Sequence, residues 1–213
     1  MSDARSDTLA RIRRALGDRQ STREDDYRAV PREYIRAGTL SIAERVRMLT
    51  ERLEDYDATV HRCPSSELRE TIGRVLGGRA RRRIAIPAGL PKAWIPDGIE
   101  TLVDDGLDHA ALDGTDGVLT PCTVAIALTG TIILTHSAAE GRRALSLVPD
   151  YHLCVIRTDQ IVETVSEGLR EAWRLRPTVV TTIAGPSATA DIEMTRIKGV
   201  HGPRTLDVII LDG

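Results

Sequence analysis

Residues 153–183 have the sequence LCVIRTDQIVETVSEGLREAWRLRPTVVTTI, and this stretch decides the fold class. A short run rich in apolar and β-branched residues opens it at 153–156, and a second such run closes it at 178–183. Between the two runs, residues 160–176 show the apolar spacing of a helix. Strands that alternate with helices are typical of an α/β domain with a largely parallel sheet. We therefore expect an α/β fold with a mostly parallel sheet flanked by helices.

The same kind of apolar run recurs on both sides of this stretch. Residues 84–86 and 206–211 predict two further strands, and residues 124–134 predict a longer one. Thr129 and Gly130 interrupt the longer run, so we expect a tight hairpin or a bulged pair of strands there.

The first part of the chain is helical in pattern and highly charged. Leucine and isoleucine recur at helix spacing over residues 9–16, and residues 18–38 are charged and contain proline and glycine, which is typical of a linker. The expected organisation is therefore an amino-terminal helix and charged linker over residues 1–38, followed by an α/β domain over residues 39–213.

The segment that follows the linker predicts two helices and one strand. The helices are expected over residues 41–55 and 65–76, the second with Ser65 or Ser66 as its N-cap. A short strand is expected between them at residues 59–61.

Composition excludes several classes of protein. A chain of 213 residues with a formal net charge of -2 has no basic domain face, so we expect no nucleic-acid partner. Cys63, Cys122 and Cys154 have none of the spacings of a metal or iron–sulfur site, so we expect no metal on this chain. The longest apolar run is too short to span a bilayer, and we expect a cytoplasmic protein with reduced thiols.

The segment IAGPSATADIE, residues 183–193, follows the last strand of the opening stretch. Gly185 permits a positive φ, and Ser187 and Thr189 are suited to cap a helix, whose amino terminus binds carboxylates or phosphates. A ligand site is one interpretation; a purely structural strand-to-helix turn, with Asp191 and Glu193 as first-turn carboxylates, is the other.

Two further segments contain side chains suited to a polar ligand. GVHGPRT, residues 199–205, places His201 in a glycine-rich loop, where it is either an acid/base or anchoring group or a hydrogen-bonded turn residue. ALTGTIIL, residues 127–134, is followed by Arg142 and Arg143, and either guanidinium can clamp a carboxylate or a phosphate. Taken alone, the two arginines are better explained by a solvated surface loop.

These segments together define one predicted site, which we place in a single cleft at the carboxyl ends of the strands. The candidate catalytic residues are Glu193, Asp191 and His201. The candidate ligand-binding residues are Thr129, Gly130, Thr131, Arg142, Arg143, Gly185, Ser187, Ala188, Thr189, His201 and Gly202.

The segments VAIALTGTIIL, EGRRALSLVPDYHLCVI and IAGPSATADIEMTRIKGVHGPRTLDVIIL together resemble the LUD domain family. The resemblance is close over about residues 116–211. It implies the α/β fold shared with ribose-5-phosphate isomerase, glucosamine-phosphate deaminase and CoA transferases. It also implies a role, with two iron–sulfur partner proteins, in the bacterial oxidation of L-lactate to pyruvate. The absence of a cysteine cluster fits an iron-free subunit, so the iron–sulfur clusters are expected on the partners and no cofactor on this chain.

One position departs from the family pattern. Relatives usually have an acidic residue before Thr-Gly-Thr, whereas this chain has Leu128. The favoured hypothesis is thus a subunit of an L-lactate utilisation system that itself binds a small anionic ligand. The alternatives are a stand-alone enzyme acting on a sugar phosphate or acyl-CoA, and a non-catalytic ligand-sensing or scaffold protein.

Overall fold

The computed structural model describes residues 3–17, 23–190, 196–198 and 201–212. The chain divides into two compact units, Met1–Tyr34 and Ile35–Gly213. The division expected after residue 38 falls a few residues inside the second unit.

The first unit contains two helices, α1 (Ala4–Leu16) and α2 (Arg23–Ala29). The carboxylate of Asp3 caps α1 by accepting a hydrogen bond from the backbone N–H of Arg5. The expected amino-terminal helix is therefore present. The expected linker is in part helical, because α2 forms within it.

The second unit is built on a six-stranded sheet in the order β1-β12-β7-β4-β2-β3, in which every neighbouring pair is parallel. This arrangement confirms the predicted fold class. The strands are β1 (Thr59–Pro64), β2 (Arg83–Pro87), β3 (Glu100–Asp104), β4 (Gly117–Pro121), β7 (Tyr151–Arg157) and β12 (Thr205–Asp212).

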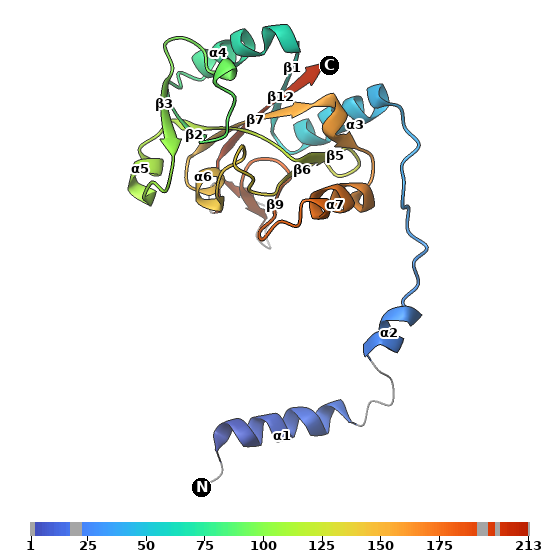
Figure 1. Ribbon diagram of the computed structural model, residues 1–213. Coiled ribbons are helices and arrows are strands. Elements are labelled where there is room, and N and C mark those ends of the chain that lie inside the picture. Colours follow the sequence, from blue (N-terminus) through green and yellow to red (C-terminus); the bar gives the residue numbers. More distant parts are fainter. Residues whose placement is uncertain (1–2, 18–22, 191–195, 199–200, 213) are drawn as a thin grey trace. The chain divides into compact units, whose positions relative to one another are not determined.

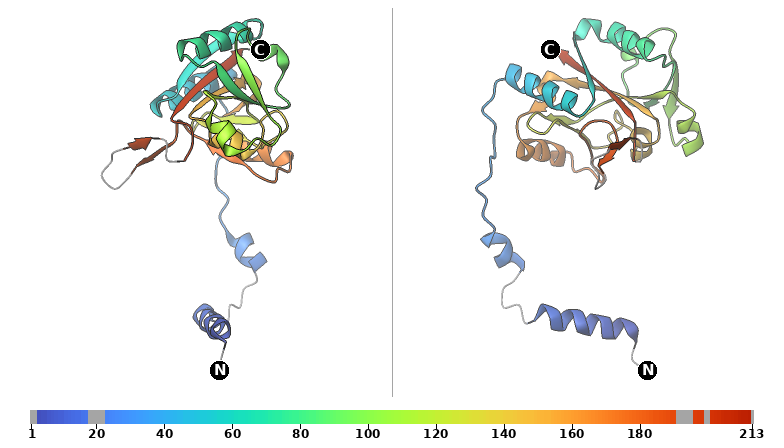
Figure 2. Two further views of the ribbon diagram at one scale, coloured as in Figure 1. Left: turned by 90° about the vertical axis from the view of Figure 1, so that its left-hand side faces the viewer. Right: turned by 180° about the vertical axis from the view of Figure 1, so that it is seen from behind.

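A smaller sheet in the order β8-β5-β6-β9 packs beside the large one. Its strands are β5 (Val124–Ile126), β6 (Thr131–Leu134), β8 (Ile161–Val162) and β9 (Thr181–Ile183). The antiparallel pairing of β5 with β6 confirms the predicted hairpin. Two more strands, β10 (Ala188–Ala190) and β11 (Arg196–Lys198), pair only with each other among the described residues and stand out from the unit in Figure 2.

Helices cover both sheets, and capping boxes fix where two of them begin. Ser41 with Glu44 caps α3, and Thr164 with Glu167 caps α7. The helices are α3 (Ile42–Asp55), α4 (Leu68–Gly78), α5 (His109–Asp113), α6 (Arg143–Leu147) and α7 (Val165–Arg174), with 3₁₀ turns at Ser65–Glu67, Lys92–Trp94 and Thr158–Gln160.

The core is divided into layers by the large sheet, because alternate strand residues point to opposite faces. On β7, Leu153 and Val155 join the cluster that packs against α4. Cys154 and Ile156 join the cluster formed with α3 and the small sheet. Figure 1 shows this order of layers, with α4 on one side of the large sheet and the small sheet and α7 on the other.

Three local expectations were wrong. The helix predicted from Ser65 begins as a 3₁₀ turn, and neither serine acts as the N-cap of α4. The segment expected to be helical over residues 160–176 first forms the short strand β8, and only then α7. The strand predicted over residues 178–183 is limited to β9.

Candidate functional site

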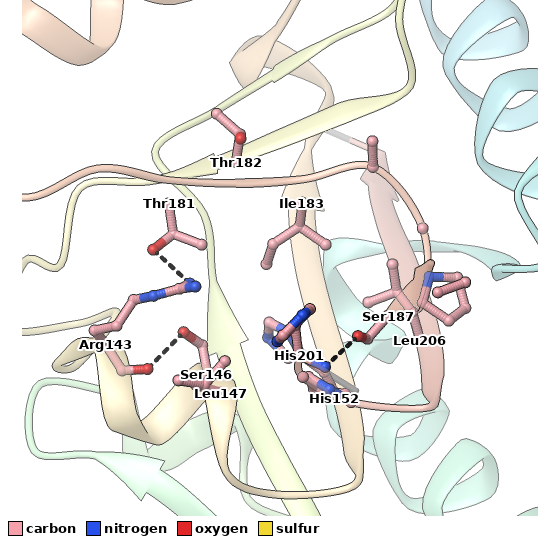
Figure 3. Close-up of a pocket in the computed structure, with 16 residues that line it drawn as sticks. Arg143, Ser146, Leu147, His152, Thr181, Thr182, Ile183, Ser187, His201 and Leu206 are labelled. Atoms are coloured by element: carbon pink, nitrogen blue, oxygen red, sulfur yellow. Dashed lines mark hydrogen bonds between the residues drawn. The ribbon is translucent and has the colours of Figure 1, made fainter. Parts of the chain in front are cut away.

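A cavity of about 210 Å³ lies beside the first residues of β7 and β12. It is lined by Arg143, Ser146 and Leu147 of α6 and by His152 and Leu206 of the two strands. Residues 181–188, which run from β9 to the start of β10, and loop residues 201–203 complete the lining. Figure 3 shows how these side chains surround it.

The position of the cavity corrects the expectation of a cleft at the carboxyl ends of the strands. His152 is the second residue of β7, and Leu206 is the second residue of β12. Because the two strands are parallel and adjacent, the loops that precede them meet at the same edge of the sheet. The cavity is therefore built at the amino ends of β7 and β12.

Arg143 supplies the permanent positive charge of the cavity. It is the first residue of α6, and its Nη1 donates a hydrogen bond of 3.0 Å to Thr181 Oγ1 (Figure 3). The described lining contains neither Asp nor Glu. A guanidinium without a competing carboxylate in the same cavity favours a carboxylate or phosphate ligand.

His152 contributes a neutral imidazole to the same cavity. Its side chain is buried, and its Nε2 lies 2.8 Å from the hydroxyl oxygen of Thr120 on β4. Burial lowers the pKa of His152 to about 4, because an imidazolium would lose its hydration there. At neutral pH, His152 is thus a hydrogen-bonding group without charge.

Two of the predicted loops meet at the cavity through backbone contacts. The backbone N–H of His201 donates to Ser187 Oγ at 3.1 Å, and the N–H of Ser187 donates to the carbonyl oxygen of Pro203 at 2.8 Å. Gly202 and Gly185 line the cavity too. Gly185 has φ +92, and a Cβ there would lie 2.7 Å from the Cβ of Tyr56, so only glycine fits without a shift.

A second cavity of about 620 Å³ adjoins the first and shares Arg143, Leu147, His201 and Gly202 with it. Its remaining lining includes the exposed ion pair of Arg204 with Asp150. The hydrogen bond from Arg204 lowers the pKa of Asp150. Arg143 and His201 therefore line both cavities, and a ligand that extends from the first cavity into the second can reach the two residues.

Arg142 lies outside the cavity. Its guanidinium forms a bidentate pair with Asp104, at 2.9 and 3.0 Å, and also donates to the carbonyl oxygen of Leu107. The Asp104 side chain is 1% exposed. Burial alone would raise the pKa of Asp104, but the hydrogen bonds from Arg142 and from two backbone N–H groups lower it. The guanidinium of Arg142 is therefore engaged by Asp104, and its expected role in ligand binding stays a prediction.

Thr129, Gly130 and Thr131 do not line the cavity. They form the turn between β5 and β6, where the two threonine hydroxyls bond each other at 2.8 Å and Gly130 lies against Arg52 of α3. Since β6 is antiparallel to β9, this turn leaves the small sheet at the same edge as the loop that contains Gly185. The predicted convergence is therefore partial.

The segment of residues 187–190 does not begin a helix. Ala188 lines the cavity, and Thr189 lies opposite Ile197 in the β10–β11 pair. The structural alternative of a strand-to-helix turn is also wrong, because residues 188–190 form strand β10 and not the start of a helix. Asp191 and Glu193 lie outside the described residues, so their catalytic role stays a prediction. Within the described ranges, no cluster of three His, Cys, Asp or Glu side chains is placed to hold a metal ion.

The structure brings together six of the predicted ligand-binding residues: Arg143, Gly185, Ser187, Ala188, His201 and Gly202. Their role in binding stays a prediction. Sequence reasoning missed His152 and Thr181. The signal for His152 was a histidine inside an apolar strand run, whereas Thr181 had no signal apart from its place in a predicted strand.

Comparisons of the sequence with known proteins all point to one protein family. The model of the LUD domain matches residues 94–211. Lactate utilization protein C of Deinococcus radiodurans is 44% identical over 99% of this chain and 96% of its own length. Lactate utilization protein C of Exiguobacterium sp. is 28% identical over 97% of this chain and 95% of its own length.

A solved structure is also similar. The crystal structure of a DUF162 family protein from Deinococcus radiodurans superposes with a TM-score of 0.70 at 43% identity. The superposition covers 81% of this chain and 99% of that one. None of the helices in the described part of the chain has the length and apolar character needed to cross a membrane.

Proposed function

Because this chain belongs to the LUD domain family, we propose that it serves bacterial lactate utilisation as a subunit that binds a small anionic ligand. The observation that carries this proposal is the 44% identity, over nearly the full length of both chains, to a protein named for lactate utilisation. The cavity with Arg143 and no described carboxylate supports the anionic character of the ligand.

In this proposal the electron-transferring iron–sulfur clusters belong to partner proteins. The placement of the cysteines supports that division. Cys63 is buried in the core cluster on one face of the large sheet, whereas Cys122 and Cys154 are buried in the cluster on the other face. An iron–sulfur cluster needs several cysteine thiolates around one point, and the large sheet separates Cys63 from the other two cysteines.

A genetic experiment tests the proposed role. Deletion of the gene should abolish growth on L-lactate as sole carbon source, and the unaltered gene should restore it. The Arg143→Ala gene should restore growth poorly, because the cavity loses its only described guanidinium. Arg83→Ala is the matched control, since Arg83 pairs with Glu100 at an exposed site outside the cavity. Unimpaired growth of the deletion strain would remove the proposal.

Ligand binding is tested directly by thermal unfolding with L-lactate, pyruvate, phosphate esters and CoA. A ligand at a hundred times its dissociation constant stabilises the folded protein by about 2.7 kcal/mol. Stabilisation by one of these anions that disappears in Arg143→Ala supports the cavity as the site. Turnover of a sugar phosphate or an acyl-CoA by the purified chain alone would instead support the alternative of a stand-alone enzyme.

A further inference from the structure

The hydroxyl of Thr181 lies between a guanidinium and an imidazole. Arg143 Nη1 is 3.0 Å from Thr181 Oγ1 on one side, and His136 Nε2 is 2.7 Å from it on the other. The other ring nitrogen of His136, Nδ1, lies 2.8 Å from the carbonyl oxygen of Gly141. Thr181 is 6% exposed, so the hydroxyl at the centre of the network is largely shielded from water.

The chemistry of the end groups fixes the direction of the two outer hydrogen bonds in this network and allows Thr181 to donate in the middle one. A guanidinium only donates, so the Thr181 oxygen accepts from Arg143, and its single proton is left to donate to His136 Nε2. A carbonyl only accepts, so His136 Nδ1 must carry the ring proton and donate it to Gly141. The tautomer that lets Thr181 donate to the ring carries its proton on Nδ1 and leaves Nε2 as the acceptor.

We infer that His136 is a positioning residue for the anion site, acting through the Thr181 hydroxyl to hold the guanidinium of Arg143 in the cavity. The inference deepens the proposed function, since it depends on Arg143 being the group that meets the anion. With its proton committed to His136, the Thr181 oxygen keeps its lone pairs directed at Arg143. Within the described part of the chain, one N–H of Arg143 is held by Thr181, and its other donors are available to a ligand.

The backbone around His136 supports this role. His136 has φ +58, a left-handed conformation that is uncommon for a residue other than glycine and that persists only where its surroundings enforce it. Glu140 provides that enforcement. Its buried carboxylate accepts hydrogen bonds from Thr123, from the N–H and hydroxyl of Thr135, and from the N–H and hydroxyl of Ser137. The loop is thus built to hold His136 in place.

The first test is a spectroscopic measurement that needs no ligand. The ¹⁵N chemical shifts of the imidazole nitrogens report which of the two carries the proton. We expect His136 in the ligand-free protein to be protonated on Nδ1 with Nε2 as acceptor, and we expect the Nε2 resonance to move when Thr181→Val removes the hydroxyl donor. A ring protonated on Nε2 would overturn the inference, because Thr181 would then not donate its proton to His136.

The second test is a double-mutant cycle with pyruvate and inorganic phosphate as probes, measured by titration calorimetry. Thr181→Val keeps the size and the β-branch of the side chain, and we expect it to weaken binding about tenfold through the loss of one charge-assisted hydrogen bond. Thr181→Ser keeps the hydroxyl and should recover most of the affinity. His136→Asn tolerates the left-handed backbone, loses the Nε2 acceptor and should weaken binding roughly threefold.

The double variant decides whether the residues act as one unit. If His136 works through Thr181, then His136→Asn adds no loss in the Thr181→Val background. Losses that multiply would overturn the inference while leaving the proposed function intact. Failure of both probes to bind the unaltered chain would count against the proposed anion site, and the imidazole measurement would still decide the hydrogen-bond network.

Discussion

The buried imidazole of His152 makes the stability of the protein depend on pH in a defined window. Its pKa is lowered to about 4 by burial, from 6.5 for an exposed histidine. Between pH 4 and pH 6.5, His152 is largely protonated in the unfolded chain and largely neutral in the folded chain. The contribution of His152 to the free energy of unfolding is therefore fully present above pH 6.5 and is lost progressively as the pH falls towards 4.

The size of the effect follows from the difference in pKa. Each pKa unit corresponds to about 1.4 kcal/mol, so the full difference is worth roughly 3 kcal/mol. Between pH 7 and pH 5 the expected loss from this one residue is about 2 kcal/mol. His152→Gln should remove this loss, because its terminal amide retains a polar contact with Thr120 but does not titrate.

The assay is urea unfolding followed by circular dichroism at pH 7 and pH 5. His61 must be replaced first, because burial lowers its pKa as well and its titration would add to the pH dependence. The comparison is therefore between His61→Gln and the double variant His61→Gln/His152→Gln. We expect the first to lose about 2 kcal/mol more than the second on going to pH 5. An equal loss in both proteins would refute the account of His152 as a buried neutral group.

Two further predictions concern residues around the site. Arg142→Ala leaves the buried Asp104 carboxylate without its counter-charge and should lower the free energy of unfolding by about 2 kcal/mol, since Arg142 itself is 40% exposed; a change near zero in urea unfolding would contradict this. Gly185→Ala should lower the melting temperature more than Gly98→Ala. Both glycines have positive φ, but only at Gly185 does the added Cβ meet a neighbour, Tyr56, so equal shifts would rule out the steric explanation.

The sequence was informative where burial imposes a simple pattern. Strands β7 and β12 are covered on both faces, so they appear in the sequence as continuous apolar runs. The strands β3 and β4 escaped prediction, because β3 is an edge strand with exposed positions and β4 is bounded by Gly117 and Pro121. Their places in the sheet are set by pairing with β2 and β7, which no local pattern contains.

The loops that line the site could be predicted from the sequence, but the direction and partners of individual side chains could not. The glycines and hydroxyl residues indicated a polar hollow, and Arg143, Ser187 and His201 do line one. Adjacent residues at a helix start point in different directions, so the sequence could not tell that Arg142 pairs with Asp104 while Arg143 faces the cavity. Helical capping by Ser187 and Thr189 was wrong because residues 188–190 pair as a strand with the nearby residues 196–198.

The central claim is that the cavity beside β7 and β12 holds a small anion through Arg143. It is tested most directly by titrating ¹⁵N-labelled protein with pyruvate and following the amide resonances. The account predicts saturable shifts centred on Ser146, Thr181 and Ser187, and their disappearance in Arg143→Ala. Shifts that persist in Arg143→Ala, or that centre on the separate hollow at Arg79, would contradict it.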